Sequence, residues 1–360
     1  MPDDISWSEP ARHDQTKQLP VAIIGMSARL PGARDIAEYW SNLSTGQDVV
    51  SHIPGDRWDW TAFDGSAADP GYKSYANQGG FISAADCFDS GFFGFLPKEA
   101  QSMDPQQRLF LEASYAALED AGIAPKSLAG SQTGVFVGVG NADYPVLMRE
   151  NNVPLDGYRG TGMALTAISN RVSFHLDLRG PSSSIDTACS GSLVAIHRAM
   201  HALEAGECDL AIVGGVNLIL GPELYVAFSK AEMLSPRGRC HTFDDSADGY
   251  VRGEGVGALI LRRLDDAEEA GDHIHGVILG SAENHGGRAH SFTAPNADAQ
   301  ADVIRQAWKR AGLNPRSAAL IETHGTGTPL GDPIEINALN TVMDEAEEAA
   351  PYLCREPIRL

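Results

Sequence analysis

The chain has 360 residues, of which 43% are hydrophobic, so it is long enough to bury a large core in one or two domain-sized units. Its 27 Lys and Arg residues stand against 48 Asp and Glu residues, which gives a formal net charge of −21. Such a negative charge argues against a nucleic-acid surface and against binding to anionic membranes. We interpret the acidity as a source of solubility.

Targeting and disulfide signals are missing from the sequence. Residues 1–19 are polar and mixed in charge, without the apolar run of a signal peptide, and they predict a flexible N-terminal lead. The longest apolar stretch, residues 210–220, is interrupted by glycine and asparagine and is too short to cross a bilayer. The five cysteines are odd in number and widely spaced, which argues against a disulfide framework. We therefore expect a cytoplasmic protein with free thiols.

Strand and helix patterns alternate along the chain. Short β-branched runs predict buried strands at residues 21–24, 135–137, 210–213, 275–279 and 319–321. Helical periods predict helices at residues 106–120, 190–205 and 300–311. Asp104 is placed to cap the first of these helices, with Pro105 at its first position. The alternation predicts an α/β fold with a largely parallel sheet covered on both faces.

A charged, helix-prone segment at residues 261–272 separates two regions that each contain such strands and helices. We expect a first unit at residues 20–266, which contains Cys189. The second unit is expected at residues 267–360. The two regions share no obvious sequence repeat.

Cys189 is the first candidate for chemistry. It follows a short strand-like piece and small residues, and it directly precedes the helix predicted from Ser190. Unpaired backbone N–H groups and the helix dipole at such a position favour a thiolate, and they can stabilise the oxyanion formed when the thiolate attacks a thioester. The alternative is a free cysteine buried at a tight turn.

His324 is the second candidate. It lies where the predicted strand at residues 319–321 gives way to a loop rich in glycine and threonine. Loops at the carboxyl ends of parallel strands are where α/β proteins place ligand sites. His324 is therefore placed as an acid, a base or a hydrogen-bond donor, and Thr326 and Thr328 offer hydroxyls to a polar ligand. A capping histidine beside a flexible turn is the alternative.

Taken together, the segments around Cys189 and His324 resemble the polyketide synthase branch of the β-ketoacyl synthase family. DTACS at residues 186–190 is similar to the family's nucleophile motif, and HGTGT at residues 324–328 is similar to its first histidine motif. Further matches are VAIIGM at 21–26, MDPQQR at 103–108, RGPS at 179–182 and GYVRGEG at 249–255. The resemblance runs from about residue 20 to the end of the chain.

The resemblance implies a thiolase-like fold, in which two βαβαβ-type halves stack as α-β-α-β-α layers and the protein pairs as a homodimer. It implies that Cys189 takes an acyl chain from phosphopantetheine on an acyl carrier protein, or from coenzyme A. A malonyl unit on a carrier protein is then decarboxylated and condensed with it. His324 would support decarboxylation, Thr326 and Thr328 would contact the pantetheine arm, and Asp332 and Glu335 would support the catalytic bases from a second layer. No metal or tightly bound cofactor is implied, and the other partners are further modules of a synthase.

One departure from the family limits this expectation. The family also uses a lysine and a second histidine, in a motif just beyond the strand that residues 357–360 are predicted to begin. The 360 residues do not contain that motif. We therefore expect the second half to be incomplete, and full condensing activity to be absent from this chain.

Three other functions are alternatives. A non-elongating ketosynthase would only pass acyl chains on, and a non-catalytic partner subunit would usually lack Cys189. A degradative thiolase has a different nucleophile motif. His197 and His201 stand four residues apart, as in half of a zinc site, but Arg198 occupies the glutamate position of the metalloprotease pattern and no third ligand is evident.

Overall fold

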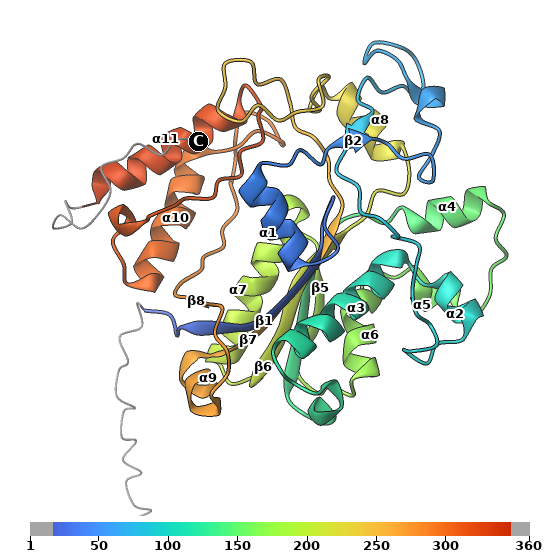
Figure 1. The fold of residues 1–360 in the computed structure, drawn as a ribbon. Helices are drawn as coiled ribbons and strands as arrows, with labels where there is room; N and C mark the ends of the chain where they lie inside the picture. Colours follow the sequence, from blue (N-terminus) through green and yellow to red (C-terminus); the bar gives the residue numbers. More distant parts are fainter. Residues whose placement is uncertain (1–16, 347–360) are drawn as a thin grey trace, which may run out of the picture.

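The computed structural model describes residues 17–346 (Figure 1). Its strands are β1 Val21–Arg29, β2 Ser51–His52, β3 Gln78–Gly79, β4 Thr133–Gly138, β5 Ser182–Ile185, β6 Leu210–Asn217, β7 Gly255–Arg263 and β8 Gly276–Ile278. Its α-helices are α1 Ile36–Thr45, α2 Pro97–Ser102, α3 Pro105–Asp120, α4 Tyr144–Glu150, α5 Arg159–Gly162, α6 Ala167–His175, α7 Gly191–Glu204, α8 Glu223–Lys230, α9 Leu264–Ala270, α10 Ala297–Ala311 and α11 Gly331–Glu345.

Six strands form the central sheet in the order β5-β4-β6-β7-β1-β8. β4 pairs in parallel with β5 and β6, whereas β7 is antiparallel to β6 and β1, and β8 is antiparallel to β1. The α/β class is confirmed, but the expectation of a largely parallel sheet is wrong, because three of the five strand pairs are antiparallel. Parallel pairing requires a crossover, and helices α6 and α7 make those crossovers only for β4, β5 and β6.

Alternating residues of the strands enter two different hydrophobic cores. Val135, Val137 and Ile212 belong to the core that also contains apolar residues of α3 and α6. Phe136 and Val213 belong to the core that contains apolar residues of α7. Helices therefore cover both faces of the sheet, as expected from the alternation of strands and helices (Figure 1).

Helix α3 begins as the sequence predicts. Pro105 is its first residue, and the Asp104 carboxylate accepts a hydrogen bond of 2.9 Å from the backbone N–H of Gln106. Asp104 is only 2% exposed. Burial raises the pKa of the Asp104 carboxyl to about 6, although the hydrogen bonds from Gln106 oppose that shift.

The second region contributes β8 to the sheet of the first region, by pairing with β1. Helices α10 and α11 pack against each other through Ala301, Ala338 and Val342. The predicted strand at residues 319–321 is wrong: these residues lie in irregular structure, because no strand within residues 17–346 pairs with them. The strand predicted to begin at residues 357–360 lies outside the described residues.

The predicted unit boundary at residues 266 and 267 falls inside α9, and β8 beyond it joins the first unit's sheet, so the boundary stays a prediction.

Residues 1–16 of the predicted flexible lead lie outside the described residues. Gln18 is anchored, because its backbone N–H donates to the Arg310 carbonyl at 2.8 Å and its Oε1 accepts from the Ser281 N–H at 2.9 Å. No helix of residues 17–346 is long and apolar enough to span a membrane.

The Asp104 carboxyl gives a testable pH dependence. Because its pKa is higher in the folded chain than the value of about 4 in an unfolded chain, its contribution to stability is present at low pH and is lost as the pH rises through about 6. Asp104→Asn keeps a capping oxygen and removes the buried charge. We expect the free energy of unfolding of this variant, relative to wild type, to rise by on the order of 2 kcal/mol between pH 4 and pH 7.

Urea denaturation at both pH values checks this expectation. Asp35→Asn is the matched control, because the Asp35 carboxylate caps the exposed helix α1 through the Glu38 N–H at 2.8 Å. Because the Asp35 carboxylate is exposed, its replacement removes no buried charge, and comparing the two variants isolates the effect of burial at Asp104. A constant difference between Asp104→Asn and wild type would contradict the account.

Candidate active site

Cys189 lies in the short 3-10 turn Ala188–Ser190, between the end of β5 and the start of α7. The Asp186 carboxylate accepts a 3.1 Å hydrogen bond from the Ala188 N–H, and Ala188 takes the left-handed conformation with φ of 52°. The Ser190 hydroxyl donates to the Thr187 carbonyl at 2.9 Å. The turn is therefore fixed on both sides of Cys189, and the cysteine itself is exposed.

Close backbone contacts place the start of α7 against the carboxyl ends of two parallel strands. A Cβ atom added to Gly138, the last residue of β4, would lie 2.4 Å from the Gly191 carbonyl carbon. A Cβ atom on Gly215 of β6 would lie 2.9 Å from Cβ of Ser192. Only glycine allows this approach, which puts Cys189 at the sheet edge where α/β proteins bind ligands.

His324 lies in a loop that is held from α11. The Glu335 carboxylate accepts the backbone N–H groups of His324 at 2.6 Å and Gly325 at 2.9 Å. The imidazole is exposed. Within residues 17–346, no hydrogen bond joins it to the Cys189 thiol, so the structure shows the two residues separately held.

Asp332, at the start of α11, is the other carboxylate predicted to support this site. It is 4% exposed, and it accepts backbone hydrogen bonds from Gly327 at 3.0 Å and from Phe243 at 2.7 Å. Asp332 and Glu335 therefore both bind the backbone around the histidine loop and not the imidazole. Their contribution is to fix the loop's conformation.

The two threonines predicted to contact a pantetheine arm lie side by side. The Oγ1 atoms of Thr326 and Thr328 are 3.0 Å apart, and both residues are half-buried. Thr328 Oγ1 also accepts the backbone N–H of Gly331 at 3.0 Å, at the start of α11. The Thr328 hydroxyl is thus bonded within the protein, and the two threonines still offer hydroxyl groups near the surface of the loop.

A segment at residues 240–250, to which the motifs alone gave no role, contacts the histidine loop. The Thr242 hydroxyl donates to the Gly325 carbonyl at 2.6 Å, and the Gly249 N–H donates to the Gly327 carbonyl at 2.9 Å. The Asp332 carboxylate bonds both this segment, at Phe243, and the loop, at Gly327. The segment therefore helps to fix the conformation of the histidine loop. Its signal in the sequence was the family match at residues 249–255.

Gly327 shows how tightly the histidine loop packs on this segment. Its φ is +70°, and an added Cβ atom would lie 1.4 Å from the Cys240 carbonyl oxygen. Any side chain there would have to displace backbone. The glycine of the histidine motif is therefore required by packing as well as by its left-handed conformation.

Gly327→Ala tests that packing. We expect a large loss of stability, of about 3 kcal/mol or more, because both the φ angle and the clash with backbone are unfavourable. Gly122→Ala is the matched control: its φ is +67°, but no atom lies within 4 Å of the added Cβ. The control is expected to cost about 1 kcal/mol from the backbone conformation alone. Equal losses in thermal denaturation would contradict the packing argument.

The predicted free thiols are confirmed for the four described cysteines, and Cys354 lies outside the described residues. Among these four described cysteines only Cys208 is fully buried, whereas Cys87 and Cys189 are exposed. Burial raises the pKa of the Cys208 thiol to about 11, so that thiol is unreactive at neutral pH.

His197 and His201 do not form a metal centre in the described chain. The His197 Nδ1 atom lies 2.8 Å from the Ser281 hydroxyl, and the two rings meet edge to face with centroids 4.5 Å apart. Burial, followed by the charge of His201, lowers the pKa of His197 to about 4. No group of three potential metal ligands is present in residues 17–346.

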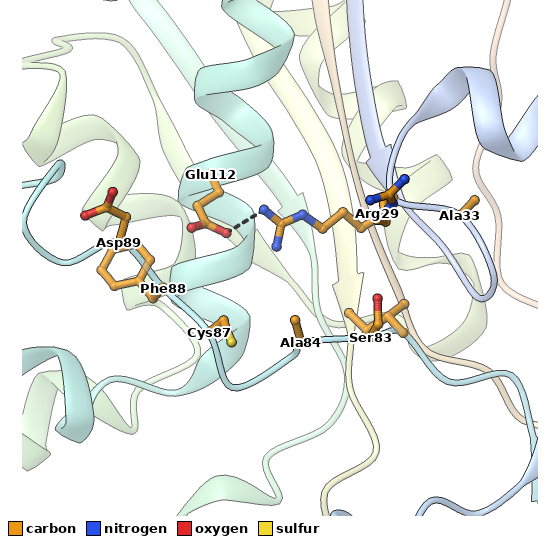
Figure 2. Close-up of a pocket in the computed structure, with 10 residues that line it drawn as sticks. Arg29, Ala33, Ser83, Ala84, Cys87, Phe88, Asp89 and Glu112 are labelled. Carbon is orange, nitrogen blue, oxygen red and sulfur yellow. Dashed lines mark ion pairs between the residues drawn. The ribbon is translucent and has the colours of Figure 1, made fainter.

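A surface cavity of about 550 Å³ lies apart from these residues (Figure 2). Arg29 and Glu112 form a 3.0 Å ion pair beside it, and Cys87 lies on the neighbouring loop. None of the predicted site residues lines this cavity. Its lining combines two arginines with two carboxylates, so the formal charges of these side chains balance.

Comparison with known proteins identifies the family. The sequence profile of the β-ketoacyl synthase N-terminal domain matches residues 18–267, and the profile of the C-terminal domain matches residues 275–354. The chain therefore belongs to the β-ketoacyl synthase family, whose members are acyltransferase-type enzymes, and it is a ketosynthase domain of the polyketide synthase type.

Individual relatives agree with this assignment. Polyketide synthase PksN of Bacillus subtilis is 51% identical over 340 residues, which are 93% of this chain and 6% of that protein. Polyketide synthase ThaG of Burkholderia thailandensis is 47% identical over 329 residues, which are 91% of this chain and 6% of that protein. The chain thus spans a small part of these curated relatives.

Two solved structures share the fold. The ketosynthase from module 6 of the bacillaene synthase of Bacillus subtilis 168 superimposes with a TM-score of 0.84 at 42% identity, over 92% of this chain and 55% of that chain. The oxazolomycin ketosynthase domain OzmH KS7 of Streptomyces albus gives a TM-score of 0.86 at 41% identity, over 91% and 57%. The expected thiolase-like fold is confirmed by these matches.

Proposed function

We propose that the chain accepts an acyl chain from a thioester onto Cys189. The observation that carries the proposal is the exposed thiol in the turn before α7, at the carboxyl ends of β4 and β6. The thiolate attacks the thioester carbonyl, a new carbon–sulfur bond forms, and the donor thiol leaves with a proton. Backbone N–H groups at the start of α7 stabilise the intermediate oxyanion.

The histidine loop supplies the second part of the proposed site. In our proposal His324 supports decarboxylation of a malonyl unit and the enolate that results, so that a β-ketoacyl product can form in the complete synthase. Thr326 and Thr328 contact the pantetheine arm of the donor. Asp332 and Glu335 act indirectly, by fixing the loop through the backbone hydrogen bonds described above.

The proposed partners follow from the same chemistry. The donor is an acyl carrier protein, which presents the acyl chain on phosphopantetheine, and no tightly bound cofactor is required. We further propose that the domain works in the cytoplasm among other modules of a synthase. A homodimer is supported by β5, which lies at an edge of the sheet and leaves backbone groups available for pairing.

Incubation with an acyl-pantetheine thioester tests the acyl transfer. We expect the intact mass to increase by one acyl group in the wild-type chain, and the adduct to map to Cys189, because that thiol is exposed at a helix start. Cys189→Ala should abolish the adduct. Cys87→Ala is the matched control, since Cys87 is also exposed and should not carry it. An adduct that persists in Cys189→Ala, or one that is spread over several cysteines, would refute the proposal.

A further inference from the structure

His197 connects the helix that follows Cys189 to the second region of the chain. It lies in α7, about two turns after the turn at residues 188–190, and it is 7% exposed. Its Nδ1 atom lies 2.8 Å from the hydroxyl of Ser281, which stands between β8 and α10. Burial, followed by the charge of His201, lowers the pKa of His197 to about 4, so this contact is a neutral hydrogen bond at neutral pH.

Ser281 is fixed to helix α10. Its N–H and its hydroxyl both donate to Gln18 Oε1, at 2.9 Å and 3.3 Å, so the hydroxyl oxygen can accept the proton of His197 Nδ1. The Ser281 carbonyl accepts a hydrogen bond of 2.9 Å from the Arg310 guanidinium of α10. A Cβ atom added to Gly280 would lie 2.6 Å from a backbone nitrogen of α10. The chain at Ser281 therefore packs directly on this helix.

Helix α10 in turn packs against α11, which holds the histidine loop. The two helices lie side by side and share a small apolar cluster (Figure 1). The Arg305 guanidinium of α10 donates to the Glu345 carboxylate of α11 at 2.8 Å. Glu335 of α11 accepts the backbone N–H of His324 at 2.6 Å. A continuous series of contacts therefore runs from α7 through Ser281 to the loop that carries His324.

We propose that His197 is a positioning residue, whose hydrogen bond to Ser281 sets where the histidine loop lies relative to Cys189. Without this bond, the pairing of β8 with β1 still joins the second region to the sheet, but α10 and α11 are held less firmly against α7. A donor thioester must reach Cys189 while its pantetheine arm contacts Thr326 and Thr328. A looser link therefore weakens binding of the arm and leaves the thiol unchanged. The inference rests on the proposed acyl transfer and pantetheine contacts.

The kinetics of Cys189 acylation test the proposal in the full chain. Mass spectrometry follows adduct formation over a range of acyl-pantetheine concentrations, which gives an apparent KM and a maximal rate. His197→Leu removes the ring nitrogens and keeps a bulky side chain, whereas His197→Asn keeps a polar nitrogen near the position of Nδ1. We expect the KM of His197→Leu to rise severalfold, up to the value of about fivefold that one neutral hydrogen bond supplies, with the maximal rate unchanged. His197→Asn should retain the wild-type KM.

Ser281→Ala tests the same hydrogen bond without any change in α7. It should raise the KM as much as His197→Leu does, and the double variant should show no further rise, because both changes break one link. Ser114→Ala is the matched control: its fully buried hydroxyl donates to the Phe110 carbonyl at 2.7 Å within α3. This control also loses one hydrogen bond, but the link to the histidine loop stays intact. It should keep the wild-type KM.

Iodoacetamide should alkylate Cys189 at the same rate in every variant, because this small reagent needs no contact with the histidine loop. A wild-type KM in both His197→Leu and Ser281→Ala, or an equal rise in Ser114→Ala, would overturn this inference alone. Additive effects in the double variant would also overturn it. Absence of any Cys189 adduct on the wild-type chain would overturn the proposed function and the inference with it.

Discussion

The buried carboxylate of Asp332 is the interaction on which the site most depends. Its two oxygens bind backbone N–H groups of separate segments, at Gly327 in the histidine loop and at Phe243 in the 240–250 segment. A buried carboxylate that lacked these donors would be costly, so each segment stabilises the position of the other. Through this link, the loop that carries His324 is fixed to the 240–250 segment.

The cysteine side of the site depends on a different constraint, the close approach of backbone at Gly138 and Gly191. That approach sets the start of α7 on the parallel strands and exposes the turn before it. Packing of glycine on glycine thus positions Cys189, the proposed nucleophile, whereas hydrogen bonds to carboxylates position the histidine loop.

Local patterns in the sequence were enough to predict particular elements. The cap of α3 by Asp104 and the placement of Cys189 before a helix follow from neighbouring residues, and both are present. Local patterns could not predict whether neighbouring strands run parallel or antiparallel, because β7 and β8 pair with a strand far away in sequence. Residues 319–321 have a strand-like composition but lack a pairing partner in the described chain. The motifs also identified the candidate residues, but the hydrogen bond that Asp332 accepts from Phe243 depends on a long-range contact that no local pattern encodes.

We propose that the turn at residues 188–190 and the histidine loop at residues 324–328 form one acyl-binding site. A crystal structure of the chain acylated on Cys189 is the decisive test. We expect the acyl group to lie between this turn and this loop, with its thioester oxygen directed at the N–H groups that begin α7. An acyl group that extends away from the histidine loop would refute the proposal.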